Sequence, residues 1–144
     1  MSEKKDIRLL DLVEIQDFCK SNGLPNFRAK QVWEWLWKKR VTSFKEMTSL
    51  SKQMRDLFTI HFNINSIKIH KAERSIDGTI KYSLQLQDKL LIESVLIPSK
   101  KRLTACISSQ VGCSLTCNFC ATGTLKLDRN LTTSEIYDQV FILN

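Results

Sequence analysis

The segment Cys113-Ser-Leu-Thr-Cys117-Asn-Phe-Cys120 places three thiols within eight residues, spaced by three and then two intervening residues. Cysteine binds metal as the thiolate, and soft thiolates select zinc, copper(I) or iron–sulfur clusters over cations that prefer oxygen. Ligands this close in sequence can reach one metal centre without long-range folding. We therefore interpret the triplet as a metal ligand set.

The number of thiols bears on the kind of metal. A structural zinc site normally closes with four protein ligands, and the two histidines, His61 and His70, stand far upstream of the triplet. Three thiolates suit a four-iron cluster that leaves one iron open to a small-molecule ligand. Zinc with Cys106 as a fourth ligand is one alternative, and three unrelated buried thiols are another.

The composition is that of a globular chain without export features. It has 144 residues, 42% of them hydrophobic, which is enough to bury a core. No apolar run approaches the eighteen or so residues of a membrane span, and the N-terminus lacks a secretory signal. We therefore expect a cytoplasmic protein without membrane contact, in which an odd count of five cysteines favours metal chemistry over disulfides.

The net charge of +7 is unevenly distributed. Residues 1–71 carry 14 Lys and Arg against 8 acidic residues, whereas residues 72–144 carry 8 against 7. The first half is therefore the candidate contact for a polyanion, although a solvated basic face would look the same.

Residues 1–63 read as a helical domain. The first helix, near 11–22, has Cys19 on its apolar side and stops at Asn22-Gly23, and the second spans about 27–40. Residues 42–62 continue as helix, with a short turn that starts at Thr42-Ser43 and a segment capped by Ser51.

In the second helix Trp33 and Trp37 lie on the apolar stripe, whereas Trp35 points away from it. Trp35 lies among basic residues, an arrangement that suits RNA phosphates and a stacked base. The RNA-contact candidates are Arg28, Lys30, Trp35, Lys38, Lys39 and Arg40. Ordinary packing of Trp35 is the alternative.

From Ile64 the hydrophobic period changes to two, which predicts a β-meander over 64–98 with a hairpin turn at Asp77-Gly78. Residues 99–144 then give a strand near 103–107, the cysteine loop and a helix that begins at a capping box, Thr132 to Glu135. Ile136, Tyr137, Val140 and Phe141 are its predicted buried side. The fold class is α+β.

Several motifs together resemble the RlmN family of dual-specificity RNA adenine C2 methyltransferases, within the radical S-adenosylmethionine (SAM) superfamily. The triplet resembles the superfamily signature. The wider family motifs are 93–98 (ESVLIP), 106–113 (CISSQVGC), 129–131 (RNL), 27–33 (FRAKQVW) and 46–51 (EMTSLS). The resemblance covers nearly the whole chain, with Lys126-Leu127 standing where members often have Gly-Phe. It implies that residues 1–63 are an RNA-binding accessory domain, 64–98 a linker, and 99–144 the first βα unit of a partial (β/α) barrel.

The resemblance also implies a role for each matching residue. Cys113, Cys117 and Cys120 would bind a [4Fe-4S] cluster whose open iron binds S-adenosyl-L-methionine. Glu93 matches the acidic residue assigned as proton acceptor, and Cys106 matches the cysteine that resolves the enzyme–RNA adduct as a thiolate base or through a transient disulfide. From the residues alone, Glu93 would be a solvent-facing acid and Cys106 a buried strand cysteine.

The activity implied is methylation of adenine C2 in 23S ribosomal RNA and in tRNA beside the anticodon, through a methylated cysteine that has no match in these 144 residues. The expected partners are these RNAs and an external electron donor, and the expected state is a monomer. We expect the 144-residue chain to be the N-terminal part of a longer protein and to be inactive alone. The alternatives are methylation of C8 of the same ribosomal adenine, as in the sister enzymes, and a non-catalytic zinc-stabilised RNA-binding module.

Overall fold

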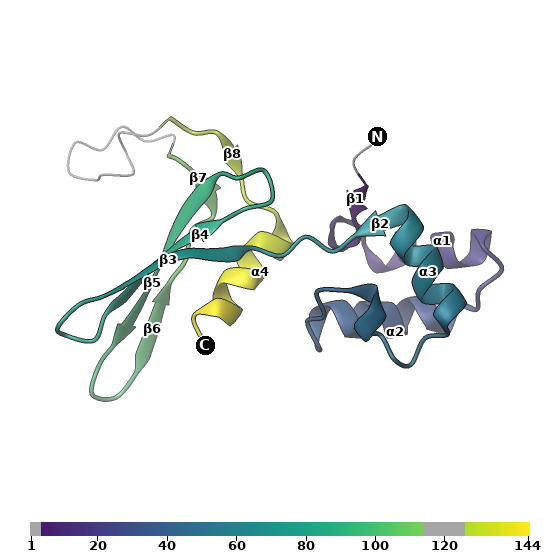
Figure 1. Ribbon diagram of the computed structural model, residues 1–144, viewed down its shortest axis with the longest axis horizontal. Helices are drawn as coiled ribbons and strands as arrows, with labels where there is room; N and C mark the ends of the chain where they lie inside the picture. Colours follow the sequence, from purple (N-terminus) through teal and green to yellow (C-terminus); the bar gives the residue numbers. More distant parts are fainter. Residues whose placement is uncertain (1–3, 114–125) are drawn as a thin grey trace. The chain divides into compact units, whose positions relative to one another are not determined.

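The computed structural model describes residues 4–113 and 126–144. The chain divides into two compact units at residue 65, namely 1–65 and 66–144. Each unit has its own hydrophobic core. Of the four α-helices in the described residues, three lie in the first unit, and most strands lie in the second, which is the segregated α+β arrangement expected from the sequence (Figure 1). Within the described residues, no helix is both long and apolar enough to span a membrane.

The first unit is built from three helices. The elements in chain order are β1 (Lys5–Asp6), the 3-10 turn η1 (Ile7–Leu9), α1 (Leu12–Ser21), α2 (Asn26–Trp37), η2 (Phe44–Glu46), α3 (Lys52–His61) and β2 (Phe62–Asn63). Strands β1 and β2 pair in parallel, which joins the two ends of the unit. Helix α1 begins at a capping box between Asp11 and Glu14 and stops before Gly23, whose positive φ of 71° suits a residue without a Cβ.

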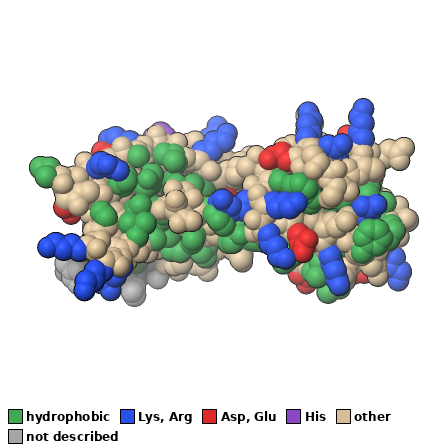
Figure 2. Space-filling view, turned by 90° about the horizontal axis from the view of Figure 1, so that it is seen from below, with side chains coloured by type: hydrophobic (Ala, Val, Ile, Leu, Met, Phe, Trp, Pro, Cys, Tyr) green, Lys and Arg blue, Asp and Glu red, His purple; other side chains and the backbone are tan. Residues whose placement is uncertain are grey.

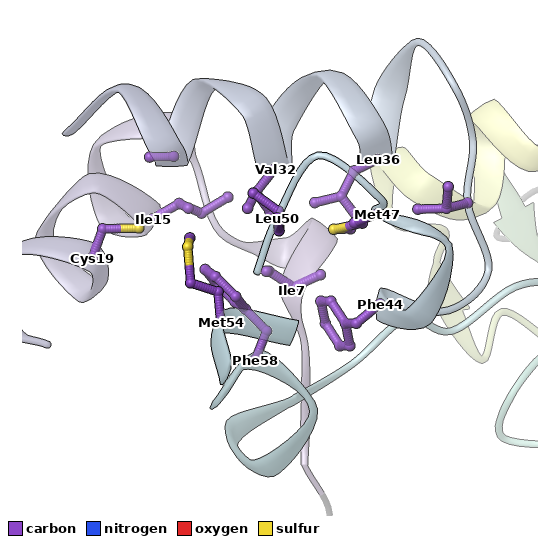
Figure 3. Close-up of a cluster of buried hydrophobic side chains, with 12 residues drawn as sticks. Ile7, Ile15, Cys19, Val32, Leu36, Phe44, Met47, Leu50, Met54 and Phe58 are labelled. Atoms are coloured by element: carbon purple, nitrogen blue, oxygen red, sulfur yellow. The ribbon is translucent and has the colours of Figure 1, made fainter. Parts of the chain in front are cut away.

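Twelve buried hydrophobic residues from all parts of this unit form its core, and Figure 3 shows most of them. Cys19 is fully buried among them, as expected, and burial raises the pKa of its thiol. Helix α2 buries Ala29, Val32 and Leu36, whereas Trp33 and Trp37 are only partly buried at the side of this stripe. The tryptophans therefore flank the core and do not fill it.

The second unit is an antiparallel sheet covered on one face by a helix. The sheet contains β3 (Lys68–Arg74), β4 (Ile80–Gln85), β5 (Leu91–Pro98) and β6 (Leu103–Cys106) in that order. The short ribbon of β7 (Gln110–Val111) and β8 (Arg129–Asn130) follows, and α4 (Thr133–Ile142) packs its Ile136 and Ile142 on the core of the sheet. Successive side chains of a strand point to opposite faces of the sheet, so about half of the side chains of each strand lie on the face opposite α4.

The strand that the sequence assigned to the first βα unit of a barrel is the fourth strand of the meander. After Pro98 the chain reverses in a tight turn, in which the Ser99 amide donates to the Arg102 carbonyl at 2.8 Å, and β6 pairs antiparallel with β5. Residues 66–144 accordingly form one unit, without a division at residue 98.

Helix α4 begins at the predicted Thr132–Glu135 capping box, but the expected buried side is wrong in part. Val140 is 46% exposed, and the side chains fully buried on this helix are those of Ser134 and Gln139. The reason is local hydrogen bonding, because the polar Gln139 side chain finds partners for all of its polar atoms beneath the sheet.

Candidate functional site

The cysteine loop enters and leaves the second unit through a narrow base. Strands β7 and β8 pair antiparallel there, the Asp128 amide donates to the Val111 carbonyl at 2.9 Å, and the Leu131 amide donates to the Ser109 carbonyl at 2.9 Å. Gly112 has a φ of 75°, and a Cβ at this position would lie 2.0 Å from the Lys126 carbonyl oxygen. The two ends of the loop can therefore approach this closely only with glycine at position 112.

Cys113 is the first residue after this base, and it is half-buried with its sulfur as a thiol. Cys117 and Cys120 lie outside the described residues, so the structure says nothing of their position. Within the described residues no group of three His, Cys, Asp or Glu side chains is arranged to hold a metal. The donor set that the sequence supplies at this loop, three thiols of which the first is at a fixed base, fits a thiolate-ligated cluster.

Glu93 and Cys106 share one face of the sheet. Cys106 pairs with Val95 in the β5–β6 register, and Glu93 is two residues from Val95, so the side chains of all three point to the face opposite α4. Cys106 is exposed, which excludes the buried strand cysteine that the residue pattern alone had suggested. Both residues lie at the end of the sheet at which the chain continues into β7.

The Glu93 carboxylate is solvent-facing and ion-paired. Its side chain is 59% exposed, and Oε1 lies 3.2 Å from Lys81 Nζ on the neighbouring strand. Lys81 also lies 3.9 Å from Glu73, which pairs with Lys71. These charges alternate in sign across β3, β4 and β5, so the charges of Lys71 and Lys81 are neutralised around Glu93.

A buried glutamine, which the sequence analysis missed, fixes the segment between Cys106 and Cys113. Gln139 Oε1 accepts hydrogen bonds from Ser94 Oγ and from the Ser108 amide, both at 2.8 Å. Gln139 Nε2 donates to the Ser108 carbonyl at 2.9 Å and to the Glu135 carbonyl at 3.2 Å. The side chain thus pairs with Ser108 much as a β-strand would, and it holds the chain just after β6. No hydrophobic pattern could have marked it.

Arg129 joins three parts of the second unit. Its guanidinium donates to both oxygens of Glu135 on α4, at 2.9 and 2.8 Å, and to Asp88 in the β4–β5 turn at 2.8 Å. These hydrogen bonds, Glu135 first, raise the pKa of Arg129. Burial alone would raise the pKa of Glu135, but hydrogen bonds from Arg129 and Thr132 outweigh it and lower that pKa. The 129–131 motif is therefore a structural brace at the loop base.

The RNA-contact candidates lie on α2 and on residues 38–40, which follow its end at Trp37, and they have different surroundings. Trp35 is partly buried, its indole N–H donates to Ser49 Oγ at 2.8 Å, and Lys39 Nζ lies 3.6 Å from the ring centroid. The Trp35 ring thus shows ordinary tertiary packing, which was the alternative to a contact with RNA. Lys38 pairs with Glu34 at 3.0 Å, and Arg28 donates to Gln31 and to the Ser49 carbonyl. Lys30 and Arg40 are exposed.

Comparisons with known proteins agree over nearly the whole chain. The family described as the ribosomal RNA large subunit methyltransferase N-terminal domain matches residues 6–64. A probable dual-specificity RNA methyltransferase RlmN from Cytophaga hutchinsonii is 52% identical over 98% of this chain and 39% of its own length. The dual-specificity RNA methyltransferase RlmN of Geotalea uraniireducens is 46% identical over 96% of this chain and 40% of its own length.

A solved structure gives the same result at the level of the fold. The crystal structure of a radical SAM methyltransferase from Sphaerobacter thermophilus superposes with a TM-score of 0.79 and 33% sequence identity, covering 96% of this chain and 41% of that one. The fold of this chain is thus similar to that of part of a radical SAM methyltransferase. The chain is similar over nearly its whole length to curated RlmN methyltransferases, and it spans about two fifths of the length of these relatives.

Proposed function

We propose that this chain supplies the accessory domain and the cluster-binding segment of an enzyme that methylates C2 of adenine in 23S ribosomal RNA and in tRNA beside the anticodon. The observation that carries the proposal is the placement of Glu93 and Cys106 on one open sheet face, at the end from which the chain continues to the loop of the three cysteines. The relatives are named RNA methyltransferases, which supports an RNA substrate.

In this proposal the thiolates of Cys113, Cys117 and Cys120 would hold a [4Fe-4S] cluster. When bound, the cluster supplies the electron that cleaves S-adenosyl-L-methionine to a radical able to attack an unreactive carbon. The tight base at Gly112 fixes where Cys113 stands, so one ligand is positioned before metal arrives.

The two open-face residues would handle protons and the RNA adduct. Glu93 would accept a proton from the adenine ring, and its carboxylate is exposed on the open face, where a substrate can reach it. The exposed Cys106 thiol would resolve the adduct, as a base or through a transient disulfide. Residues 1–63 would serve as the RNA-docking domain, and the meander of 64–98 and the segment 99–144, which fold as one unit, would together form the start of the catalytic domain. The enzyme would act as a cytoplasmic monomer with an external electron donor.

Metal loading tests the proposal directly. After anaerobic reconstitution with iron and sulfide, the wild-type chain is expected to bind about four irons and to absorb visible light, as thiolate-ligated clusters do. Cys113→Ala is expected to lose iron, whereas Cys19→Ala and Cys106→Ala retain it. A colourless protein with one zinc would instead support the zinc-stabilised module.

The position of the methyl group is a separate question. Mass spectrometry of nucleosides from RNA modified by the enzyme is expected to locate the new methyl on C2 of adenine. A methyl on C8 would assign the chain to the sister activity.

A further inference from the structure

The near balance of charge in residues 72–144 conceals a polarity along the sheet. Eight basic and seven acidic residues occur there, but they are not mixed evenly. At the end with the β3–β4 and β5–β6 turns stand four basic residues against one acid, Asp77. The four are Arg74, Lys100, Lys101 and Arg102, and all four are exposed.

The two turns that carry these cations lie side by side at one end of the sheet (Figure 1). A Cβ added at Gly78, in the first turn, would lie 3.1 Å from Pro98 Cγ, at the start of the second. Backbone hydrogen bonds close both turns, from Gly78 to Ser75 at 3.0 Å and from Ser99 to Arg102 at 2.8 Å. The turns thus form one surface, which we call the basic tip (residues 74–79 and 98–102).

The cations of the basic tip differ from those in the strands. Lys71 and Lys81 are paired with Glu73 and Glu93, whereas within the described residues no ion pair involves the four cations of the tip. Asp77 accepts hydrogen bonds from the Thr79 amide and hydroxyl, which lower its pKa and keep it ionised, so the tip holds four positive charges against one negative charge. Figure 2 shows Lys and Arg side chains gathered at this end of the β-sheet unit.

We propose that the basic tip binds the phosphate backbone of the RNA substrate at a point remote from the reacting adenine. Lys and Arg that stand unpaired on adjoining turns attract polyanions and release their counterions on contact. The cysteine loop leaves from the opposite end of the sheet, beside the β4–β5 turn held by Arg129 and Asp88. Seven residue steps along β5 separate the two ends by about 20 Å, so the tip would contact nucleotides outside the reaction site.

The inference rests on the proposed function for the identity of its partner, and paired variants test it. Lys100→Gln/Lys101→Gln neutralises two charges of the tip, and Lys68→Gln/Lys89→Gln neutralises two exposed lysines at the other end of the sheet. Binding of the chain to a fluorescent tRNA is measured by anisotropy from 50 to 300 mM salt. The tip variant is expected to lower the slope of log K against log salt by about 1.4 to 1.8, because each lost contact removes about 0.7 to 0.9.

The control pair is expected to leave that slope unchanged. Equal slopes for the tip variant and the wild type would contradict the proposed contact between the basic tip and RNA, and would leave the proposed enzymatic function unaffected. Binding of polyglutamate as tight as that of tRNA would overturn RNA as the partner. If the wild-type chain bound no RNA, both the tip and the proposed RNA contact would fail.

Discussion

At the scale of single residues, Gln139 and Gly112 place the groups around the cysteine loop, and neither carries chemistry itself. Gln139 holds Ser108 through its amide, and Gly112 permits the backbone of Lys126 to approach. Both act through backbone geometry, the first by satisfying buried polar groups and the second by having no Cβ.

Gln139→Leu keeps the volume of the side chain but leaves the Ser108 backbone and Ser94 Oγ without their partner. We expect the second unit to lose about 2 to 4 kcal/mol of stability, since several buried polar groups become unsatisfied together. Faster amide hydrogen exchange across β4 and β5 would report this loss. The exposed Gln110–Asn130 pair gives the control, and Gln110→Leu is expected to change exchange little.

Gly112→Ala tests the loop base against a matched glycine. Gly112 and Gly23 have similar φ values of 75° and 71°, but an added Cβ meets the Lys126 carbonyl at the first position and nothing within 4 Å at the second. Gly23→Ala is expected to cost about 1 to 2 kcal/mol from its backbone conformation alone. Gly112→Ala should in addition open the β7–β8 ribbon, seen as fast exchange of the Asp128 amide. Protection of that amide equal to wild type would contradict the steric account.

At the scale of elements, helix starts were predictable and long-range pairings were not. The Thr132–Glu135 capping box and the Asn22-Gly23 helix stop are local signals, and the structure bears them out. The antiparallel pairing of β6 with β5 depends on the turn at Ser99–Arg102, and the sequence equally allowed a strand that begins a new domain. In α4, hydrophobic periodicity favoured Val140 as a buried residue and could not reveal that Gln139 satisfies the backbone beneath it.

The same distinction holds for the candidate site. The three cysteines could be identified from spacing alone, because their chemistry is encoded in a few consecutive residues. The shared face of Glu93 and Cys106 required the β5–β6 register, since a shift of one residue would send one of them to the opposite face.

The brace between Arg129 and Glu135 predicts a pH dependence. The pKa of Glu135 is lowered in the folded chain, so its contribution to stability is complete above the ordinary carboxyl pKa of about 4.3 and is lost as the pH falls through the lowered folded value. Arg129→Met should therefore destabilise the second unit at pH 7 and weaken its dependence on pH below about 4.3. Hydrogen exchange at pH 7 and 3.5 measures this, with Lys38→Met, which removes an exposed pair, as the control.

At the scale of the whole molecule, the chain consists of two units with separate cores. All three tryptophans lie in the first unit, so their fluorescence reports on that unit alone. Residues 1–65 expressed alone are expected to keep a cooperative thermal transition by fluorescence, because their twelve-residue core is internal to the unit. A broad, non-cooperative change would show that this core depends on residues 66–144.

The narrow neck made by β7 and β8 also offers an engineering opportunity. Since the chain leaves and rejoins the scaffold at adjacent points, doubling the length of the enclosed segment would add only about 0.6 kcal/mol of closure entropy. Foreign ligand-bearing peptides could therefore be grafted between Cys113 and Lys126 with little disturbance to the underlying sheet and helix.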